Sequence, residues 1–207
     1  MRRFALVEYG AGNIGSLLRG LKEAGHADVQ VIRDPSGAEG SRGIIVPGVG
    51  AFASGMGRLR SEGWVEAIRA HAAAGGFVLG ICAGMQFLAS RGSEGGDTEG
   101  LDLIGGTVVP LDALGCSERL PHAGWSSVET DLHPIFDGIP SSTDFYFSHR
   151  YTFVPEDPSV VVGHFTYGVR GAAAVSAGNV HGIQFHPEKS SFAGIRVLSN
   201  IMRLAAT

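Results

Sequence analysis

Short apolar runs alternate with segments of helical periodicity in the first half of the chain. The runs that predict buried strands cover residues 4–7, 29–32, 43–46 and 76–81. Between them, apolar residues recur at helical spacing over residues 13–25, over 52–73 with glycine interruptions, and over 83–90. This alternation of strands and helices predicts a parallel sheet that is covered by helices.

The second half of the chain changes to strand-like runs separated by turn signals. These runs cover residues 105–111, 126–129, 144–147, 160–165, 172–176 and 180–185. Helical periodicity returns only near the end, where Ile195, Leu198 and Met202 share one face. We therefore predict an α/β fold in one domain, residues 1–207, with a mostly parallel central sheet flanked by helices and additional antiparallel strands in the second half.

Composition narrows the classes of function. The 207 residues include 32 glycines, about twice the average share, which suits tight turns and close backbone approaches. The net charge is −4 and there is no basic block, which argues against nucleic-acid binding. Two cysteines are too few for a disulfide framework or a cysteine-rich zinc site. Only four apolar residues precede Glu8, and no run is long enough for a membrane span, so we expect a cytoplasmic protein.

A glycine motif follows the first predicted strand. Gly10, Gly12 and Gly15 form the pattern G-x-G-x-x-G, and Asp34 stands at the end of the second strand, as in dinucleotide-binding proteins. One interpretation is a nicotinamide-dependent oxidoreductase, whose cofactor binding would survive the substitution Cys82→Ala. The other is a strand-to-helix turn that needs glycine for its geometry. The motif alone does not decide between them.

A nucleophile elbow is the strongest local signal. Gly80-Ile-Cys82-Ala-Gly84 lies between an apolar run and a helical segment, which is the G-x-nucleophile-x-G arrangement with cysteine as the nucleophile. At a helix N-terminus, Cys82 is favoured as the thiolate, and the N–H of Ala83 points to where an oxyanion forms. The alternative is a buried structural cysteine.

A base and its orienting group follow the last predicted strand. Pro187 keeps the segment at His186 extended, so that Glu188, two residues on, projects to the same side as the imidazole. A cysteine with a distant histidine and carboxylate is typical of acyl transfer. His122 and His149 flank aromatic residues, so they either line a site or pack. No histidine pair has the spacing of a metal site.

The loop Val46-Pro-Gly48-Val49-Gly50 ends the third strand-like run, at the same sheet edge as Cys82. Open α/β sheets bind ligands beyond the carboxyl ends of their strands. The two glycines let the backbone approach a substrate and offer N–H groups to a developing negative charge. A plain strand-ending turn is the other interpretation.

Together these motifs resemble the class I (triad) glutamine amidotransferases, and within them the glutaminase subunits of imidazole glycerol phosphate synthase, from histidine biosynthesis. The resemblance runs over nearly the whole chain, through residues 9–16, 47–52, 80–86, 121–125, 145–149 and 182–190. The P-G-V-G-A-F loop at 47–52 and the P-H-x-G-W motif at 121–125 favour this group. In such proteins the glycine motif is not a nicotinamide site.

The resemblance implies roles for particular residues. Cys82 attacks the side-chain amide of glutamine to form a glutamyl thioester, His186 transfers protons, and Glu188 orients His186. The residues implied to stabilise the oxyanion through their backbone are Val49, Gly50 and Ala83, and those implied to bind glutamine are Gly48, Gly50, Gln86, Glu94 and Arg150. The resemblance implies neither a cofactor nor a metal.

The resemblance also implies a partner. Ammonia would pass to a (β/α)8-barrel cyclase subunit in a heterodimer, which makes imidazole glycerol phosphate and aminoimidazole carboxamide ribotide. Pro121, Trp125, Tyr146 and Lys189 match positions at that subunit interface. Exposed Trp and Tyr side chains are also common at interfaces. The partners are thus this subunit and glutamine, with no nucleic acid and no membrane.

The chain departs from the usual pattern of this group at four positions. Ala83 replaces a leucine, Ser126 an asparagine and Glu8 an aspartate, and Arg150 is bulkier than the usual residue. One alternative is a paralogous glutaminase that supplies ammonia to a different synthase, such as a nucleotide-sugar-modifying enzyme. A non-catalytic regulatory relative is disfavoured, because the cysteine, histidine and glutamate are all intact.

Overall fold

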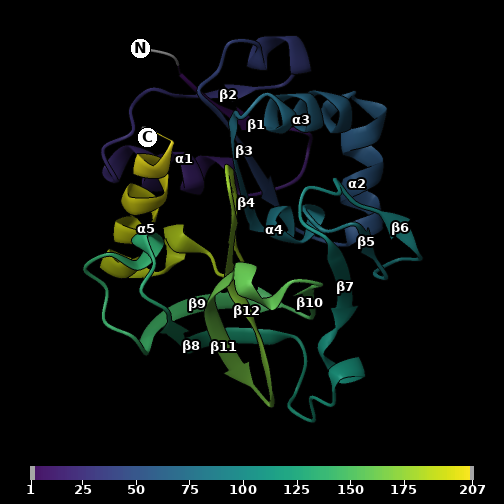
Figure 1. Cartoon of the computed structure of the whole chain (residues 1–207), viewed down its shortest axis with the longest axis vertical. Coiled ribbons are helices and arrows are strands. Elements are labelled where there is room, and N and C mark those ends of the chain that lie inside the picture. Colours follow the sequence, from purple (N-terminus) through teal and green to yellow (C-terminus); the bar gives the residue numbers. More distant parts are fainter. Residues whose placement is uncertain (1–2, 206–207) are drawn as a thin grey trace.

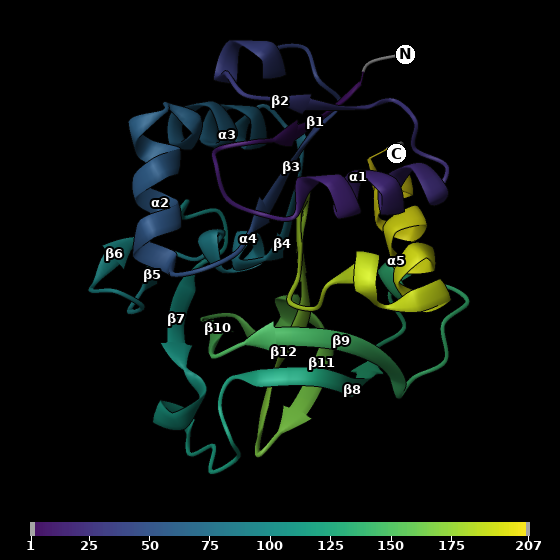
Figure 2. The same ribbon diagram turned by 180° about the vertical axis from the view of Figure 1, so that it is seen from behind.

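A nine-stranded sheet runs through the molecule, as the computed structural model of residues 3–205 shows (Figures 1 and 2). The ends of the predicted domain, residues 1–2 and 206–207, lie outside the described residues. The strand order is β2-β1-β3-β4-β13-β12-β11-β8-β9, and the strands from β2 to β13 are parallel. The bounds are β1 (Phe4–Val7), β2 (Val29–Ile32), β3 (Gly43–Gly48), β4 (Phe77–Cys82), β8 (His122–Thr130), β9 (Thr143–His149), β11 (Val161–Tyr167), β12 (Val169–Ala177) and β13 (Val180–Ile183).

Helices cover both faces of the parallel half. They are α1 (Ile14–Glu23), α2 (Phe52–Ser61), α3 (Trp64–Ala73), α4 (Ala83–Phe87) and α5 (Ser191–Leu204). In Figure 1, α1 and α5 lie on one side of β3 and β4, and α2, α3 and α4 lie on the other. Alternate strand residues serve the two layers: Leu6 packs in the core that includes α1 and α5, and Ala5 in the core that includes α2 and α3. The predicted α/β fold with a mostly parallel sheet is thus confirmed.

The second half adds antiparallel pairing, also as predicted. β12 pairs with both β13 and β11, and β8 joins β11 to β9. A second sheet, in the order β10-β7-β5-β6, consists of β5 (Arg91–Gly92), β6 (Thr98–Glu99), β7 (Gly106–Pro110) and β10 (Tyr151–Pro155). The sequence pattern missed β5, β6 and β10, because these short strands are defined by pairing: β5 and β10 pair with β7, and β6 pairs with β5.

The single helical segment predicted over residues 52–73 is wrong, since it is two helices. α2 ends before Glu62, and α3 begins after Gly63, whose φ of +76° lies in the left-handed region. Glycine tolerates this conformation because it lacks a Cβ atom. The glycines within α2 do not interrupt it: Gly55 lets α2 approach Phe87, where an added Cβ would lie 2.3 Å from the ring. Among the described residues, no helix has the length and apolar character needed to cross a membrane.

Candidate active site

The turn from β4 into α4 holds Cys82 in a constrained conformation. β3 and β4 pair in parallel up to Gly48 and Cys82, so both strands end at the same edge of the sheet. Cys82 has φ +56° and ψ −115°, which is rare for a residue with a side chain. The thiol is 5% exposed and lies at the N-terminal end of α4. The elbow predicted from the sequence is therefore present.

The glycines around Cys82 allow three backbone segments to touch. A Cβ atom on Gly84 would lie 1.8 Å from the carbonyl oxygen of Val46, and one on Gly80 would lie 2.4 Å from the oxygen of Gly84. A Cβ atom on Gly48 would lie 2.5 Å from the Gly84 nitrogen. No side chain fits at these distances, so glycine is required for α4 to pack directly on β3 and β4.

His186 and Glu188 follow β13, the neighbour of β4. Nδ1 of His186 and Oε1 of Glu188 are 3.0 Å apart, and their side chains are 8% and 4% exposed. The expected extended segment is wrong beyond His186, because Pro187–Lys189 forms a 3₁₀ helix. Proline suits the first position of such a turn, since it has no N–H to leave unpaired. The 3₁₀ turn, rather than the alternation of side chains along a strand, brings the Glu188 carboxylate within hydrogen-bond distance of the His186 imidazole.

His186 differs from every other histidine in residues 3–205. Burial lowers the pKa of His186, but hydrogen bonds with Cys82 and Glu188 and the charges of both groups raise it to about 9. Burial is the main cause that lowers the pKa in the other seven, which are His26, His71, His122, His133, His149, His164 and His181. With this raised pKa, His186 is charged at neutral pH and lies beside the Cys82 sulfur and a buried carboxylate.

A pocket of about 350 Å³ opens above Cys82. The site residues predicted from the sequence that line it are Val49, Gly50, Cys82, Ala83, Gln86, Glu94, Pro121, Arg150, His186 and Lys189. Gly48 and Glu188 do not line it, and instead border a much smaller cavity behind His186. Trp125 and Tyr146 lie outside both. The structure thus gathers residues from six parts of the chain around one thiol.

Glu94 reaches the pocket from the loop between β5 and β6. Its Oε2 accepts a hydrogen bond of 3.0 Å from the N–H of Phe52, and its carbonyl oxygen accepts one of 3.1 Å from the N–H of Ala53. Both N–H groups belong to the first turn of α2 and have no partner inside the helix. Burial raises the pKa of the Glu94 carboxyl, and the Phe52 N–H and the charge of Arg150 oppose that rise.

Gln86 and Arg150 enter the site in different ways. Nε2 of the buried Gln86 donates to the carbonyl oxygen of Tyr151 at 2.8 Å. The guanidinium of Arg150 pairs with Asp112 at 3.1 Å, and its carbonyl oxygen accepts from the N–H of Leu111. The side chain of Arg150 is therefore committed to Asp112.

Sequence reasoning missed several residues at the site. Asn13 and Tyr151 line the pocket, and Gln184 donates from Nε2 toward Sγ of Cys82 at 3.8 Å. Asn13 lies in the glycine motif and Gln184 in the motif at residues 182–190, but neither motif singled out these side chains. Such residues are identified only once the strands are placed side by side.

Of the two histidines beside aromatic residues, His149 lines the pocket and His122 packs in the interior. His149 lines the pocket, and its Nδ1 donates to the carbonyl oxygen of Tyr151 at 2.8 Å. The ring of His122 stacks on Phe147 and Tyr167 in the interior. Its Nδ1 is 3.0 Å from Nε2 of His149, so the two imidazoles are hydrogen-bonded. Burial lowers the pKa of His122 to about 4 and that of His149 to about 3, so both are neutral at pH 7.

Trp125, Tyr146 and Lys189 form a cluster that we call the aromatic strip. Trp125 is 53% exposed, and its ring centroid is 6.1 Å from that of Tyr146 across the β8–β9 pair. Nζ of Lys189 lies 5.4 Å from the Tyr146 ring, a cation–π distance. The N–H of His186 donates to the carbonyl oxygen of Tyr146 at 2.8 Å, so the strip is joined to the site through the backbone.

The glycine motif forms a strand-to-helix turn at the edge of the pocket. Gly10 and Gly12 have φ values of +76° and +112°, and Gly12 borders the small cavity behind His186. The carboxylate of Asp34 accepts from the N–H and hydroxyl of Ser36 and so caps a 3₁₀ helix. The positive φ values at Gly10 and Gly12 and the capping role of Asp34 favour the interpretation of the glycine motif as a strand-to-helix turn.

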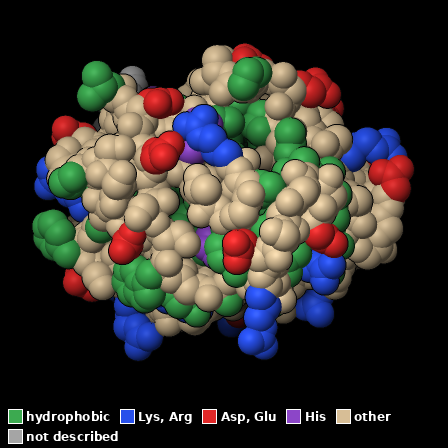
Figure 3. All heavy atoms as spheres, turned by 90° about the horizontal axis from the view of Figure 1, so that it is seen from below, with side chains coloured by type: hydrophobic (Ala, Val, Ile, Leu, Met, Phe, Trp, Pro, Cys, Tyr) green, Lys and Arg blue, Asp and Glu red, His purple; other side chains and the backbone are tan. Residues whose placement is uncertain are grey.

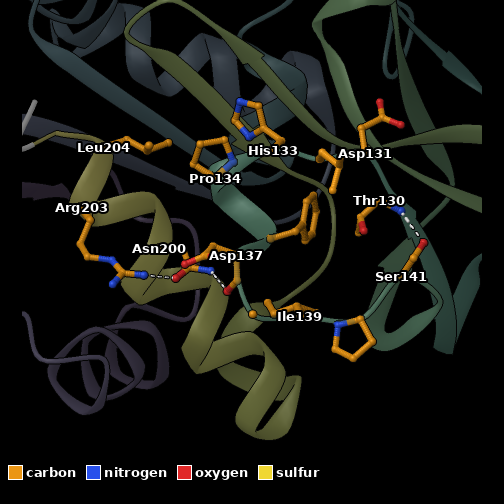
Figure 4. A pocket seen from close by; sticks show the side chains of 14 residues that line it. Thr130, Asp131, His133, Pro134, Asp137, Ile139, Ser141, Asn200, Arg203 and Leu204 are labelled. Atoms are coloured by element: carbon orange, nitrogen blue, oxygen red, sulfur yellow. Dashed lines mark hydrogen bonds between the residues drawn. The ribbon is translucent and has the colours of Figure 1, made fainter.

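A larger cavity lies elsewhere. It has a volume of about 820 Å³, and Figure 4 shows it between the β8–β9 connection and the end of α5. Asn200 donates there to the carbonyl oxygens of Ile135 and Asp137, so its amide is used in holding the loop. None of the predicted site residues lines this cavity. Within residues 3–205, no group of three or more His, Cys, Asp or Glu side chains is arranged to hold a metal ion.

One face of the molecule is mixed in character. The face seen from below in Figure 3 mixes hydrophobic, acidic and basic side chains, and histidine is visible only in small openings. This agrees with the burial of His122, His149, His181 and His186. This face therefore adds no cluster of histidines to the residues that line the pocket above Cys82.

Comparison with known proteins places the chain in a family. The family model described as "Glutamine amidotransferase class-I" matches residues 5–203. The "Imidazole glycerol phosphate synthase subunit HisH" of Moorella thermoacetica is 44% identical over 205 residues, covering 99% of this chain and 96% of that protein. The protein of the same description from Rhodospirillum rubrum is 40% identical over 213 residues, covering 98% and 99%.

Solved structures agree on the fold. A chain described as "Crystal structure of glutamine amidotransferase" has a TM-score of 0.77 and 21% identity, with 98% of this chain and 99% of that chain covered. A "putative gmp synthase subunit a protein" from Thermoplasma acidophilum has a TM-score of 0.73 and 19% identity, with 100% and 94% covered. At such identities the likeness supports the fold alone.

Proposed function

This chain belongs to the class I glutamine amidotransferase family, and we propose that it is the glutaminase subunit of an imidazole glycerol phosphate synthase in histidine biosynthesis. Its substrate is glutamine, which it hydrolyses to glutamate and ammonia. The observation that carries the proposal is that Cys82 and His186 line one pocket and that His186 is paired with buried Glu188 over 3.0 Å. Full-length identity of 39–44% to relatives of that description supports the choice of synthase.

The first half of the reaction forms a thioester. The thiolate of Cys82 attacks the side-chain carbonyl carbon of glutamine, and the carbonyl electrons move to oxygen. Backbone N–H groups at Val49, Gly50 and Ala83 stabilise that oxyanion. The His186 imidazolium then gives its proton to the amide nitrogen, the carbon–nitrogen bond breaks, and ammonia leaves. Glu188 holds the imidazole and stabilises its charged form.

The second half regenerates the enzyme. Neutral His186 takes a proton from a water molecule as the water oxygen attacks the thioester carbon. The carbon–sulfur bond breaks, glutamate is released, and the thiolate and imidazolium are restored. One glutamine and one water thus yield one glutamate and one ammonia, with no cofactor. Glu94, Gln86 and the backbones of Gly50 and Arg150, which line the pocket, bind the amino acid part of glutamine.

Ammonia passes to a (β/α)8-barrel cyclase subunit in the proposed heterodimer. The aromatic strip and Pro121 form the contact, because Trp125 is exposed and Pro121 and Lys189 also line the pocket where ammonia is released. The partner uses the ammonia to make imidazole glycerol phosphate and aminoimidazole carboxamide ribotide. Both cysteines are free thiols, as is usual in the cytoplasm, where we place the reaction.

The test compares two nitrogen sources in the reconstituted heterodimer. Cys82→Ala should abolish glutamine-dependent synthesis and leave synthesis from ammonium salts intact. Cys116→Ala is the matched control, because Cys116 is also a buried free cysteine but donates to the carbonyl oxygen of Tyr167, away from the pocket. Glutamine turnover by Cys82→Ala would refute the nucleophile, and a failure to bind the barrel subunit would refute the choice of synthase.

A further inference from the structure

Two buried glutamines lie behind the nucleophile. Gln184 follows β13 and is 0% exposed, and Gln86 on α4 is 3% exposed. Nε2 of Gln86 donates to the carbonyl oxygen of Tyr151 at 2.8 Å and to Oε1 of Gln184 at 2.9 Å. Nε2 of Gln184 in turn donates toward Sγ of Cys82 at 3.8 Å. A chain of hydrogen bonds therefore runs from a backbone carbonyl of β10 to the sulfur.

The direction of this chain is fixed by its first member. A backbone carbonyl oxygen can only accept, so the end of the Gln86 amide that faces Tyr151 must be the nitrogen. The same nitrogen also faces Gln184, and the near atom of Gln184 must then be its oxygen. The other end of that amide, which carries the N–H groups, is left facing Cys82. The main chain of Gln184 is held as well, since its N–H donates to Ala173 at 2.8 Å.

An N–H donor in this position distinguishes the two forms of the sulfur. A thiolate accepts hydrogen bonds far better than a neutral thiol does, so a fixed donor favours the charged nucleophile. His186 faces the same sulfur as the proton carrier, whereas the amide of Gln184 has no proton to transfer. The donor also serves the second half of the proposed reaction, in which the thiolate is the leaving group.

We propose that Gln184 is a further catalytic residue: its amide N–H binds the thiolate of Cys82, and Gln86 with the Tyr151 carbonyl sets the direction of that hydrogen bond. The inference rests on the proposed function, in which Cys82 is the nucleophile. Gln184 does not line the substrate pocket. Its effect is therefore on the reactivity of the sulfur and not on the binding of glutamine.

The test measures alkylation of Cys82 by iodoacetamide as a function of pH, in the full chain carrying Cys116→Ala so that one thiol reports. Gln184→Leu removes the donor and should slow alkylation near neutral pH by about tenfold, with the midpoint of the pH profile about one unit higher. Gln184→Glu keeps the shape but places an acceptor against the sulfur, and should slow alkylation further. Glutamine turnover should fall in parallel, while the inhibition constant of the product glutamate stays unchanged.

Thr152→Val is the matched control. Thr152 is also 0% exposed, and its hydroxyl has no hydrogen-bond partner in the described part of the chain, so its removal should leave the alkylation profile unchanged. An unchanged profile in Gln184→Leu, or an equal change in Thr152→Val, would overturn the proposal. If Gln184→Leu does not fold, Gln184→Met supplies an unbranched side chain without a donor, and the same outcomes apply. The alkylation assay uses no glutamine, so it separates this inference from the proposed reaction.

Discussion

The elbow at Cys82 and the aromatic strip both adjoin His186 but are held together by different kinds of contact. At the elbow, backbone touches backbone, and Gly48, Gly80 and Gly84 leave no room for a Cβ atom. Along the strip, side chains pair across strands, as Trp125 does with Tyr146. Sterics therefore fix the elbow, whereas the strip depends on side-chain contacts that substitution can change gradually. We therefore expect almost any substitution of the elbow glycines to be disruptive. Substitutions in the strip should weaken its contacts by an amount that depends on how much of the side chain is removed.

The charged pair beside the elbow should give the largest effect. Glu188→Gln keeps the size of the side chain but removes the charge that raises the pKa of His186. The neutral amide can also present its N–H to Nδ1 and favour the wrong tautomer, so kcat for glutamine should fall by about 10³-fold or more. Glu129→Gln is the control, since Glu129 forms an exposed pair with Arg170. A Glu188→Gln enzyme with a tenth of normal turnover would contradict the orienting role.

A Cβ atom in the elbow should give the next largest effect. Gly84→Ala forces a carbon to within 1.8 Å of the Val46 oxygen, so strands and helix must separate, and unfolding free energy should drop by about 3 kcal/mol. Gly57→Ala is the matched control, because Gly57 lies exposed in α2 with nothing within 4 Å of the added atom. That variant should gain about 0.5 kcal/mol. Urea unfolding measures both, and equal stabilities would show that the elbow is looser than its geometry implies.

The strip should show a smaller and graded response. Trp125→Ala removes an exposed aromatic anchor and should weaken binding to the barrel subunit about thirtyfold, equivalent to about 2 kcal/mol. Lys189→Ala removes the cation over Tyr146 and should weaken binding less. Leu132→Ala, also at a fully exposed apolar side chain but outside the strip, serves as the control. Calorimetric titration with unchanged affinity for Trp125→Ala would exclude the strip from the interface.

Protons should affect the two regions in opposite directions. His122 and His149, behind the strip, have pKa values lowered by burial to about 4 and about 3. The unfolded chain therefore binds protons first as pH falls below 6.5, and unfolding free energy should decline by up to about 1.4 kcal/mol per pH unit for each group. The pKa of His186 is raised to about 9, so the protonated imidazole adds to the free energy of unfolding. This stabilisation is fully present below pH 6.5 and is lost as the pH rises through about 9. A flat stability profile below pH 6.5 would contradict the neutral state of the buried pair.

The features that could be predicted from the sequence are those with a local steric or chemical cause. The flanking glycines of Cys82 and the His-Pro-Glu segment are local patterns with steric or chemical causes, so they indicated both the sheet edge and the residues now found around one pocket. Gln184 and Tyr151 were not singled out, because their hydrogen bonds join segments that meet only in the folded chain. β10 was missed because its pairing with β7 defines it. The break at Gly63 and the 3₁₀ turn at Pro187–Lys189 instead depend on the local backbone conformation, which the periodicity of apolar residues does not report.

The backbone conformation of Cys82 has a consequence for the stability of the native chain. A left-handed φ of +56° burdens a side-chain-bearing residue, and glycine at the same position would relieve that burden. Cys82→Gly should therefore be inactive and yet unfold at a higher temperature than the native chain, by an amount corresponding to about 1 kcal/mol, whereas Cys82→Ala should not gain in this way. The cysteine at this bend therefore lowers the stability of the native chain, and the proposed chemistry is what requires a side chain there.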